Sequence, residues 1–418
     1  MIRPLVVTCC LIVLPISLLA ADWPQWRGPN RDGIAPGAEL PSKWPAEAPT
    51  AKWKVVVGGG YSGPAVTGGR VFIMGRVEKD EQCLCFDADT GKELWRVGYP
   101  EPFKAPDPTA GTGPNATPTV DGDRVYMLGL GGVLQALDVT SGKVLWKHNC
   151  QKEYWGEKKG PLGDDAWFPP CGASASALVD GDTVIVPIGG PKAGAFTGFD
   201  RKTGDIRWKA LDDRSSYASP LIAAPSGVKQ LIGFTGTRMV GLRHADRELL
   251  WDVPFQARYE QTIITPVVWR DLVIVAGEGK PTTAVRITES QGKVAKEIAW
   301  RSDDLKVYLT TPIVFQDHLC GHDTRTNRLV CLDLETGKSV WSSPRITGKY
   351  HSLVLAGGVI LMLTSEGELV VCKATTEEYT ELARWKVAEK GTWAHLAVTG
   401  NRLYVKDKEY LYCYELNK

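Results

Sequence analysis

Apolar and polar residues alternate in short stretches along most of this chain, and Gly and Asp interrupt the alternation. Between residues 116 and 146 there are four such stretches, at 116–120, 124–128, 133–138 and 143–146, and Asp121-Gly122-Asp123 separates the first two. Alternation over roughly four to eight residues places the apolar side chains on one face of a β-strand, while Gly and Asp form the turns. The pattern predicts four short antiparallel strands in succession.

This four-strand unit recurs along the chain. Four copies share Asp-x-x-(Thr or Ser)-Gly-x-x-x-Trp, at 87–95, 138–146, 200–208 and 333–341. A tryptophan closes seven units at intervals of 41 to 62 residues: Trp95, Trp146, Trp208, Trp251, Trp300, Trp341 and Trp385. Such a period indicates modules that bury their apolar faces by stacking. Four strands in each module predict the blades of a β-propeller.

The two ends of the chain supply one further blade between them. After Trp385 only three strands remain, at 393–398, 402–406 and 410–415, and a fourth is available at 52–57. Trp53, in that early strand, lies 42 residues before Trp95. The sequence therefore predicts an all-β fold, an eight-bladed β-propeller of four-stranded antiparallel blades that the N-terminal strand closes. Closure removes two unpaired sheet edges that would invite aggregation.

The closing tryptophans are predicted to dock between neighbouring blades, because a cofactor would need one such ring and not eight. They are Trp53, Trp95, Trp146, Trp208, Trp251, Trp300, Trp341 and Trp385. Three blades have lost the shared phrase. Arg243 and Arg247 replace its Asp and Gly before Trp251, and the hairpins before Trp300 and Trp385 are longer. We expect these blades to be present and less regular.

The N-terminus reads as an export signal. Residues 1–21 combine Arg3, an apolar stretch at 5–20 and small residues before a cleavage point, although a membrane anchor is an alternative. We expect residues 22–50 to form an extended leader, packed on the outside of the ring through Trp23 and Trp26, and residues 51–418 to form the propeller. The mature chain would then be exported to the periplasm or cell envelope, without a transmembrane span.

Charge excludes one class of partner. The chain has 49 basic and 48 acidic residues, a net charge of +1, and no long run of either sign. Nucleic-acid-binding proteins usually carry a basic patch or stripe. The sequence therefore predicts no nucleic acid partner.

The cysteines fall into two groups. Cys85, Cys331, Cys372 and Cys413 occupy one register of the third strand, which Ala136 and Gly198 fill in two other blades. A position restricted to small residues is a tight buried one, where free Cys packs as an apolar side chain. By contrast, Cys150 and Cys171 bracket an insertion, and we predict a disulfide between them.

One cluster resembles metal ligands. In His318-x-Cys320-x-His322, alternation would place all three side chains on the same face of a strand, and imidazole and thiolate suit zinc or copper. That face packs on a neighbouring blade, and no fourth ligand is apparent. The set is therefore a weak metal candidate, and we predict no metal.

The innermost strands carry a pattern of their own. One position holds a hydroxyl in six blades: Thr117, Ser176, Ser219, Thr265, Thr311 and Ser352. Gly63 and His395 occupy it in the other two. These hydroxyls are expected to satisfy backbone groups between blades. Two residues earlier stand Tyr61, Tyr217, Tyr350 and Trp393, with Asn115 in the second blade. Because innermost strands line the central channel, these rings are candidate ligand or partner contacts.

A second candidate surface lies on the insertion at residues 147–172. It carries Trp155, Trp167 and Phe168 beside several lysines. Exposed aromatic residues mixed with cations are typical of protein interfaces. The sequence therefore predicts a protein or peptide partner at this loop.

With these repeats, the chain resembles the PQQ-like β-propeller repeat proteins, a superfamily that includes quinoprotein alcohol dehydrogenases and BamB. The resemblance covers about residues 50 to 418, and the leader from Trp23 to Gly33 is similar to the opening of exported members. The resemblance implies PQQ and calcium for a dehydrogenase, held beside a disulfide of adjacent cysteines. Here the only adjacent cysteines are Cys9 and Cys10, inside the predicted signal, and no acidic pair stands out.

Two functions follow from these observations. The first is a non-catalytic, monomeric scaffold in the envelope that binds a protein or ligand and needs no cofactor. The alternative is a quinoprotein dehydrogenase that uses PQQ with calcium on an alcohol or sugar. Capture of carbohydrate at the channel mouth is a third possibility.

Overall fold

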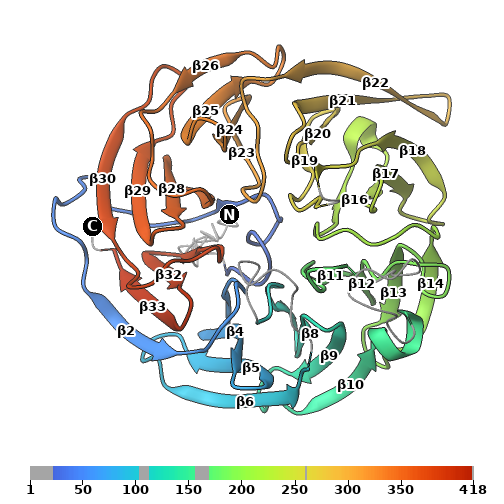
Figure 1. The fold of residues 1–418 in the computed structure, drawn as a ribbon, viewed down its shortest axis with the longest axis horizontal. Coiled ribbons are helices and arrows are strands. Elements are labelled where there is room, and N and C mark those ends of the chain that lie inside the picture. The colour runs from blue at the N-terminus through green and yellow to red at the C-terminus, as the bar shows by residue number, and fades with distance from the viewer. Residues whose placement is uncertain (1–21, 103–112, 156–168, 259–260, 417–418) are drawn as a thin grey trace, which may run out of the picture.

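A computed structural model describes residues 22–102, 113–155, 169–258 and 261–416. Their strands form eight sheets set around a central axis (Figure 1). Seven blades run outward from the axis in chain order, the eighth ends on the N-terminal strand, and neighbouring strands within the eight blades pair antiparallel. The predicted all-β, eight-bladed propeller is confirmed.

The first four blades have the following strands. Blade 1 contains β3 (Ala65–Thr67), β4 (Arg70–Val77), β5 (Asp80–Asp87) and β6 (Glu93–Pro100). Blade 2 contains β7 (Thr119–Asp121), β8 (Arg124–Leu128), β9 (Val133–Asp138) and β10 (Val144–Asn149), followed by a π-helical turn, η2 (Gln151–Trp155). Blade 3 contains β11 (Leu178–Asp180), β12 (Thr183–Val186), β13 (Phe196–Asp200) and β14 (Ile206–Ala210). Blade 4 contains β15 (Leu221–Ala223), β16 (Gln230–Phe234), β17 (Arg238–Arg243) and β18 (Leu249–Pro254), with a short 3₁₀ turn, η3 (Pro225–Gly227).

The remaining blades complete the circle. Blade 5 contains β19 (Val267–Trp269), β20 (Leu272–Val275), β21 (Thr282–Ser290) and β22 (Lys293–Ser302). Blade 6 contains β23 (Ile313–Phe315), β24 (His318–Asp323), β25 (Arg328–Asp333) and β26 (Ser339–Ser342). Blade 7 contains β27 (His351–Ala356), β28 (Val359–Thr364), β29 (Glu368–Lys373) and β30 (Glu381–Lys386). Blade 8 contains β31 (Ala397–Thr399), β32 (Arg402–Lys406), β33 (Tyr410–Glu415) and β2 (Ala51–Val56).

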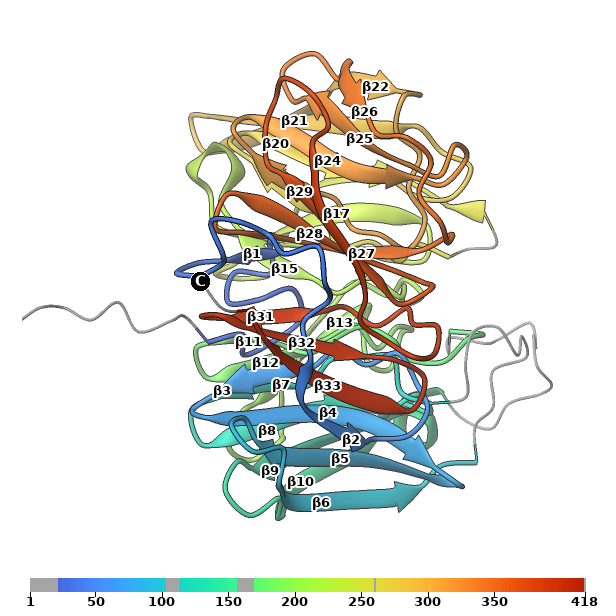
Figure 2. The same cartoon turned by 90° about the vertical axis from the view of Figure 1, so that its left-hand side faces the viewer.

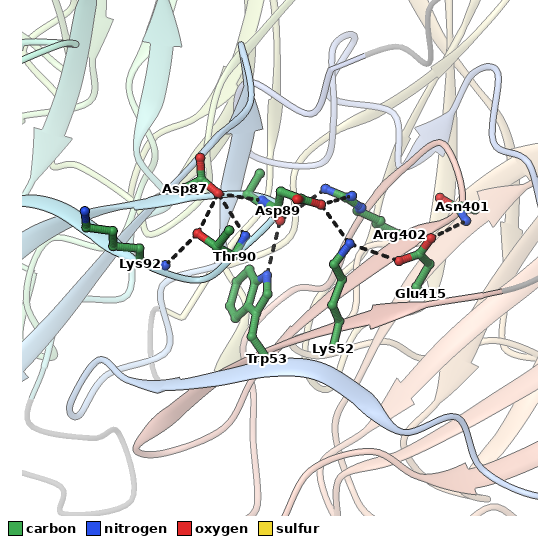
Figure 3. A network of polar contacts seen from close by, with 10 residues as sticks. Lys52, Trp53, Asp87, Asp89, Thr90, Lys92, Asn401, Arg402 and Glu415 are labelled. Carbon is green, nitrogen blue, oxygen red and sulfur yellow. Dashed lines mark hydrogen bonds and ion pairs between the residues drawn. The ribbon is translucent and has the colours of Figure 1, made fainter.

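The predicted closure is confirmed. Strand β2 pairs antiparallel with β33, and Trp53 lies opposite Cys413. A polar network next to this pair ties blade 8 to the turn of blade 1 (Figure 3). Lys52 reaches Asp89 at 2.7 Å and Glu415 at 3.2 Å, and Arg402 reaches Asp89 at 2.6 Å. Exposed ion pairs stabilise little individually, so the sheet pairing carries the closure.

The shared Asp-x-x-(Thr or Ser)-Gly-x-x-x-Trp motif explains how one blade docks on the next. The indole nitrogen of each of five tryptophans donates to a carbonyl in the outer turn of the following blade, at 2.8 to 3.2 Å. These bonds join Trp53 to Ala88, Trp95 to Val139, Trp146 to Arg201, Trp300 to Leu334 and Trp341 to Thr375. In four of the five pairs, all except Trp341, the turn also places its glycine against the ring, and a Cβ built on Gly142 would lie 2.7 Å from Trp95. The repeat therefore encodes an interface between blades.

The other three tryptophans differ because their neighbouring turn differs. Before Trp251 the glycine position holds Arg247, whose guanidinium lies 4.5 Å from the centre of the Trp208 ring. Trp251 bonds within its own blade, to Gln230 at 2.6 Å. Trp385 faces the gap between the chain ends and donates to the carbonyl of Pro45 at 3.1 Å. A leader residue thus replaces the turn that blade 8 lacks.

Small residues of the third strand make room for these rings. Cys85 pairs with Trp95, Cys331 with Trp341 and Cys413 with Trp53, and all three cysteines are fully buried. These contacts confirm the predicted packing role of this register. Cys372 is also buried, but it pairs with Glu381, because the longer hairpin of blade 7 shifts the register.

The expected place of the leader is wrong. Instead of packing outside the ring, residues 23–33 occupy the axis, and β1 (Ile34–Ala35) adds a parallel strand to the inner edge of blade 7. In Figure 1 this dark-blue segment lies at the centre of the ring, and in Figure 2 β1 lies toward the left-hand face. Residues 1–21, the predicted signal, lie outside the described residues, and the domain boundaries stay predictions.

The leader makes hydrogen bonds to all eight blades. In order from blade 1 to blade 8, the bonds join Trp23 to Val66, Pro24 to Val120, Arg31 to Ser176 and to Pro220, Trp26 to Thr265, Arg27 to Thr311, Gly33 to Leu355, and Glu39 to Gly400. Arg27 and Arg31 are 1% and 3% exposed, and backbone carbonyls accept most of their bonds. Residues 23–39 are called the hub below.

Three histidine side chains are buried. His322 of β24 and His351 of β27 meet with ring centres 3.9 Å apart, and their ring nitrogens have no hydrogen-bond partner among the residues that the structure describes. Burial lowers the pKa of His322 to about 4 and that of His351 to about 2. It lowers the pKa of His395, in the channel wall, to about 3. All three are neutral in the folded protein at neutral pH.

Replacing Gly142 with Ala should destabilise the protein through the ring of Trp95. Both Gly142 and Gly181 have positive φ, 71° and 56°, so alanine strains the backbone at either site. Only at Gly142 does the new methyl group meet an indole, since nothing lies within 4 Å of a Cβ on Gly181. Overpacking costs about 1 to 3 kcal/mol, so Gly142→Ala should unfold at lower urea than Gly181→Ala by about that difference. Equal midpoints would contradict the docking interface.

Acid should unfold the protein through its buried histidines. Below about pH 6.5 these histidines take up protons in the unfolded chain, whereas in the folded protein they stay neutral until the pH is far lower. Their full contribution to the free energy of unfolding is therefore present above about pH 6.5 and is lost as the pH falls below it. Each histidine contributes about 1.4 kcal/mol per pH unit in this window. Urea unfolding at pH 7.5, 5.5 and 4.5 should show a shallower loss for His351→Phe than for the wild type. His318→Gln is the control, since that ring already reaches water. Parallel curves for His351→Phe and wild type would contradict the assignment.

A cup on the ring axis as the candidate functional site

A cavity of about 260 Å³ opens on the axis of the ring, and we call it the cup. Its described lining residues are Trp26, Tyr61, Asn115, Cys171, Ser174, Tyr217, Ser219, Gln261, Ile263, Tyr308, Leu309, Tyr350 and Trp393. None of them is charged. Drug-sized ligands usually occupy cavities of roughly 300–1,000 Å³, so the cup suits a small ligand or a single projecting group.

The register of the innermost strands builds the cup. Each blade places one residue at the same level of the channel, two positions before the hydroxyl layer. From blade 1 to blade 8 these residues are Tyr61, Asn115, Ser174, Tyr217, Ile263, Leu309, Tyr350 and Trp393. The predicted channel-mouth rings, Tyr61, Tyr217, Tyr350 and Trp393, are therefore brought together in one cavity. Their role as ligand contacts stays a prediction.

Aromatic rings form one wall of the cup. Tyr61 stacks on Trp393 with ring centres 4.7 Å apart and 20° between the planes. Tyr350 meets Trp393 edge-on at 4.8 Å, and Tyr308 meets Tyr350 edge-on at 5.6 Å. Offset and edge-to-face geometry at these distances is favourable for aromatic pairs. The four rings therefore form one continuous, mutually supported arc across blades 6, 7, 8 and 1.

The opposite wall is polar and neutral. The amide nitrogen of Asn115 donates to Ser174 at 3.3 Å, and its buried Oδ1 has no hydrogen-bond partner within the described part of the chain. Gln261 lies between two groups: its Oε1 accepts a hydrogen bond from Tyr308, and its Nε2 contacts the sulfur of Cys171 at 3.8 Å. On the aromatic wall, burial raises the pKa of Tyr61 above its ordinary value. The hydroxyl of Tyr61 therefore stays neutral at physiological pH.

The hub closes one end of the cup. The indole nitrogen of Trp26 donates to Thr265 at 2.8 Å, and the edge of its ring meets His395 at 5.1 Å. In blades 1 to 7 the hub contacts lie about two to five residues beyond the cup residue of the same inner strand. At roughly 3.3 Å per residue, this separates the two levels by about 7 to 17 Å. The cup is therefore blind, and a ligand enters from the face opposite the hub.

The hydroxyl layer lies at the level of the first hub contacts, and its predicted role is confirmed for five of its six hydroxyls. Each of these five oxygens accepts a hydrogen bond from a backbone amide of a neighbouring blade, at 2.9 to 3.4 Å. The oxygen of Thr265 instead accepts one from the indole nitrogen of Trp26. The five bonds from backbone amides run from Gly63 to Thr117, Thr117 to Ser176, Ser176 to Ser219, Thr265 to Thr311, and Leu396 to Ser352. These bonds replace sheet pairing near the axis. Consequently the inner strands are shorter than the sequence suggested, and β7 begins at Thr119 instead of Ala116.

The predicted disulfide is not formed, because Cys150 and Cys171 are both free thiols. Their surroundings explain the difference. Cys150 is fully buried in an apolar cluster with Ala173 and Ile188. Cys171 lies at the cup, and its backbone amide donates to the hydroxyl of Tyr217 at 3.1 Å. The two side chains therefore belong to different sites.

His318, Cys320 and His322 do not form a metal centre in the structure. Cys320 is fully buried in the apolar cluster of blades 6 and 7. His318 bonds to the backbone oxygen of Gln316 at 2.6 Å, whereas His322 faces His351. In the part of the chain that the structure describes, no three His, Cys, Asp or Glu side chains converge as a metal site would require.

The second predicted surface cannot be placed. Trp167 and Phe168 lie outside the described residues, as does the side chain of Trp155. Sequence reasoning also missed Trp26, Tyr308 and Gln261, which line the cup from the leader and from the loops that enter blades 5 and 6. Only Trp26 carried a signal, as one of two tryptophans in a leader that was expected to lie outside.

PQQ and calcium do not fit this cup. PQQ carries three carboxylates and calls for cationic partners, and calcium calls for several oxygen ligands that usually include carboxylates. The described lining contains no Lys, Arg, Asp or Glu. Trp26 and Trp393 could stack on a planar group, but no charged side chain of the described lining could bind either the acid groups or the cation.

Comparison with known proteins agrees with this architecture. A family model described as "outer membrane protein assembly factor BamB" matches residues 42–187 and 163–343. The chain belongs to this family.

A curated relative and two solved structures extend the match. The outer membrane protein assembly factor BamB of Moranella endobia (strain PCIT) is 25% identical over 273 residues, which span 62% of this chain and 64% of that protein. BamB from Moraxella catarrhalis superposes with a TM-score of 0.60 at 16% identity, over 88% of this chain and 98% of that one. Quinohemoprotein alcohol dehydrogenase from Comamonas testosteroni superposes with a TM-score of 0.62 at 13% identity, over 94% of this chain and 80% of that one. At these identities the two structures show a shared fold and no more.

Among the described residues of this BamB family member, no helix combines the length and the apolar character needed to cross a membrane.

Proposed function

We propose that this protein is a non-catalytic binding scaffold of the periplasm or cell envelope, and that its ligand or partner is held at the cup. The observation that carries the proposal is the cup itself, to which each of the eight blades contributes at least one side chain. Rigid scaffolds with preformed neutral cavities bind without needing catalytic groups. A monomeric ring, closed by its own leader, supplies such a scaffold.

Export is part of the proposal. Cleavage after residue 21 would leave Asp22 as the first residue, and its carboxylate accepts a hydrogen bond from Thr67. The next residue, Trp23, exchanges two backbone bonds with Val66, each 2.7 Å long. Removal of residues 1–21 would therefore leave every hub contact in place, which supports their interpretation as a signal.

Family membership supports a partner in the envelope. The relatives bear the name of an outer membrane assembly factor, and such a factor works through protein partners. The stretch matched by the curated relative spans 64% of that protein, so a shared partner is part of the proposal and not a finding. A protein partner would contact the face on which the cup opens and present one group to the cup. A PQQ-dependent dehydrogenase is the alternative, and the uncharged lining of the cup disfavours it.

Photo-crosslinking in the native envelope tests this proposal. Benzoylphenylalanine placed at Leu309, in the cup wall, should give an adduct of defined mass, because a bound group would lie within reach. The same probe at Leu94, which is 42% exposed on the outer rim, is the control and should give none. Adding Tyr350→Ala should reduce the adduct at residue 309. Equal labelling at both positions, or none at residue 309, would overturn the proposal.

A further inference from the structure

We infer that the occupant of the cup is a neutral sugar ring, the terminal pyranose of a glycan. The inference rests on the proposed function, since it names the chemical class that the same site binds. It follows from the uncharged lining of the cup, the hydrogen-bonded backbone at its base, its two walls and its closed end.

The uncharged lining excludes anionic ligands. The thirteen described lining residues contain neither a carboxylate nor a cation, and a buried ion without a partner is strongly disfavoured. Phosphorylated and carboxylated ligands would each leave a charge uncompensated.

The backbone excludes main-chain recognition of a peptide. Peptides that bind along a strand do so through free backbone donors and acceptors at a sheet edge. At the base of the cup, the amides of Gly63, Thr117 and Ser176 already donate to hydroxyls of the next blade. The innermost strands therefore offer no such edge at this level, and recognition falls to side chains.

The two walls match the two kinds of surface on a pyranose. A sugar ring has an apolar face of C–H groups, which lies flat on an aromatic ring, and hydroxyls around its perimeter. The arc of Tyr308, Tyr350, Trp393 and Tyr61 supplies aromatic surface on one side. Amides and hydroxyls supply hydrogen bonds on the other, and the buried Oδ1 of Asn115 has no donor among the described residues. Buried acceptors normally find a donor, and a sugar hydroxyl can provide it.

The closed end fixes which part of a glycan can enter. Trp26, held by Thr265, lies beneath the cup, so a polymer cannot thread through the ring. With about 260 Å³ available, the cup accommodates the end of a chain and leaves the rest outside. The ligand is therefore a terminal sugar, either on a free oligosaccharide or on a larger glycan.

Titration of the purified full-length mature protein with neutral oligosaccharides tests this inference. The probes are the tetraoses of β-linked glucose, α-linked glucose, mannose, xylose and N-acetylglucosamine, with calorimetry as the readout and tryptophan fluorescence as the second signal, because Trp26 and Trp393 line the cup. At least one probe should bind saturably. Its Kd should rise at least tenfold in Tyr61→Ala, which removes part of the stacking wall, and in Asn115→Leu, which removes the polar contact.

Leu94→Ala on the rim is the matched control, and its Kd should equal that of the wild type. Unchanged melting temperatures would confirm that the variants are folded. Failure of all five probes to bind, or equal binding by wild type and both cup variants, would overturn the inference. Saturable binding of a neutral proline-rich peptide in place of the sugars, lost in the same variants, would also overturn it. A peptidic adduct at residue 309 would then still support the proposed function, whereas sugar binding without any adduct would overturn the proposed function and leave the sugar assignment in place.

Discussion

Two buried arginines in the leader hold the inner ends of the blades together. Arg31 donates to carbonyls of blades 3 and 4, and Arg27 donates to carbonyls of blade 6. Burial lowers the pKa of Arg27 to about 10 and that of Arg31 to about 9, so both remain charged at neutral pH. A buried cation is tolerable only when its donors are satisfied, and here backbone oxygens satisfy most of them. The guanidinium groups thus require the inner strands to converge on them.

This constraint completes a ring that the blade repeat alone leaves open. The tryptophan contacts join neighbouring blades at the rim, but the last junction has no turn, and the leader fills it through Pro45. The same segment then continues into β2, which closes blade 8. A single stretch of chain therefore secures the axis, the gap in the rim and the final sheet. It also closes one end of the channel, which converts a pore into a cup.

The sequence predicts the parts of this molecule that repeat and misplaces those that do not. The register of the repeated strands predicts three features: the number of blades, the closure of the ring at Trp53, and the position of Tyr61, Tyr350 and Trp393 around one cavity. The leader has no second copy, and polar residues such as Arg27 and Arg31 read as surface. Their burial depends on carbonyls more than 140 residues away in the chain, which no local pattern contains. The Cys150–Cys171 pairing failed for a similar reason, because spacing does not report which way a side chain faces.

Hydrogen exchange of the inner strands tests most directly whether the hub holds the ring together. The double variant Arg27→Met, Arg31→Met should be compared by mass spectrometry with the wild type and with Arg96→Met, whose arginine pairs with Glu93 and Gln82 of blade 1. The account predicts faster exchange around 176–180, 219–223 and 311–315 in the double variant alone. Unchanged protection at all three sites would contradict it, and the leader would then be an accessory to a ring that stands without it.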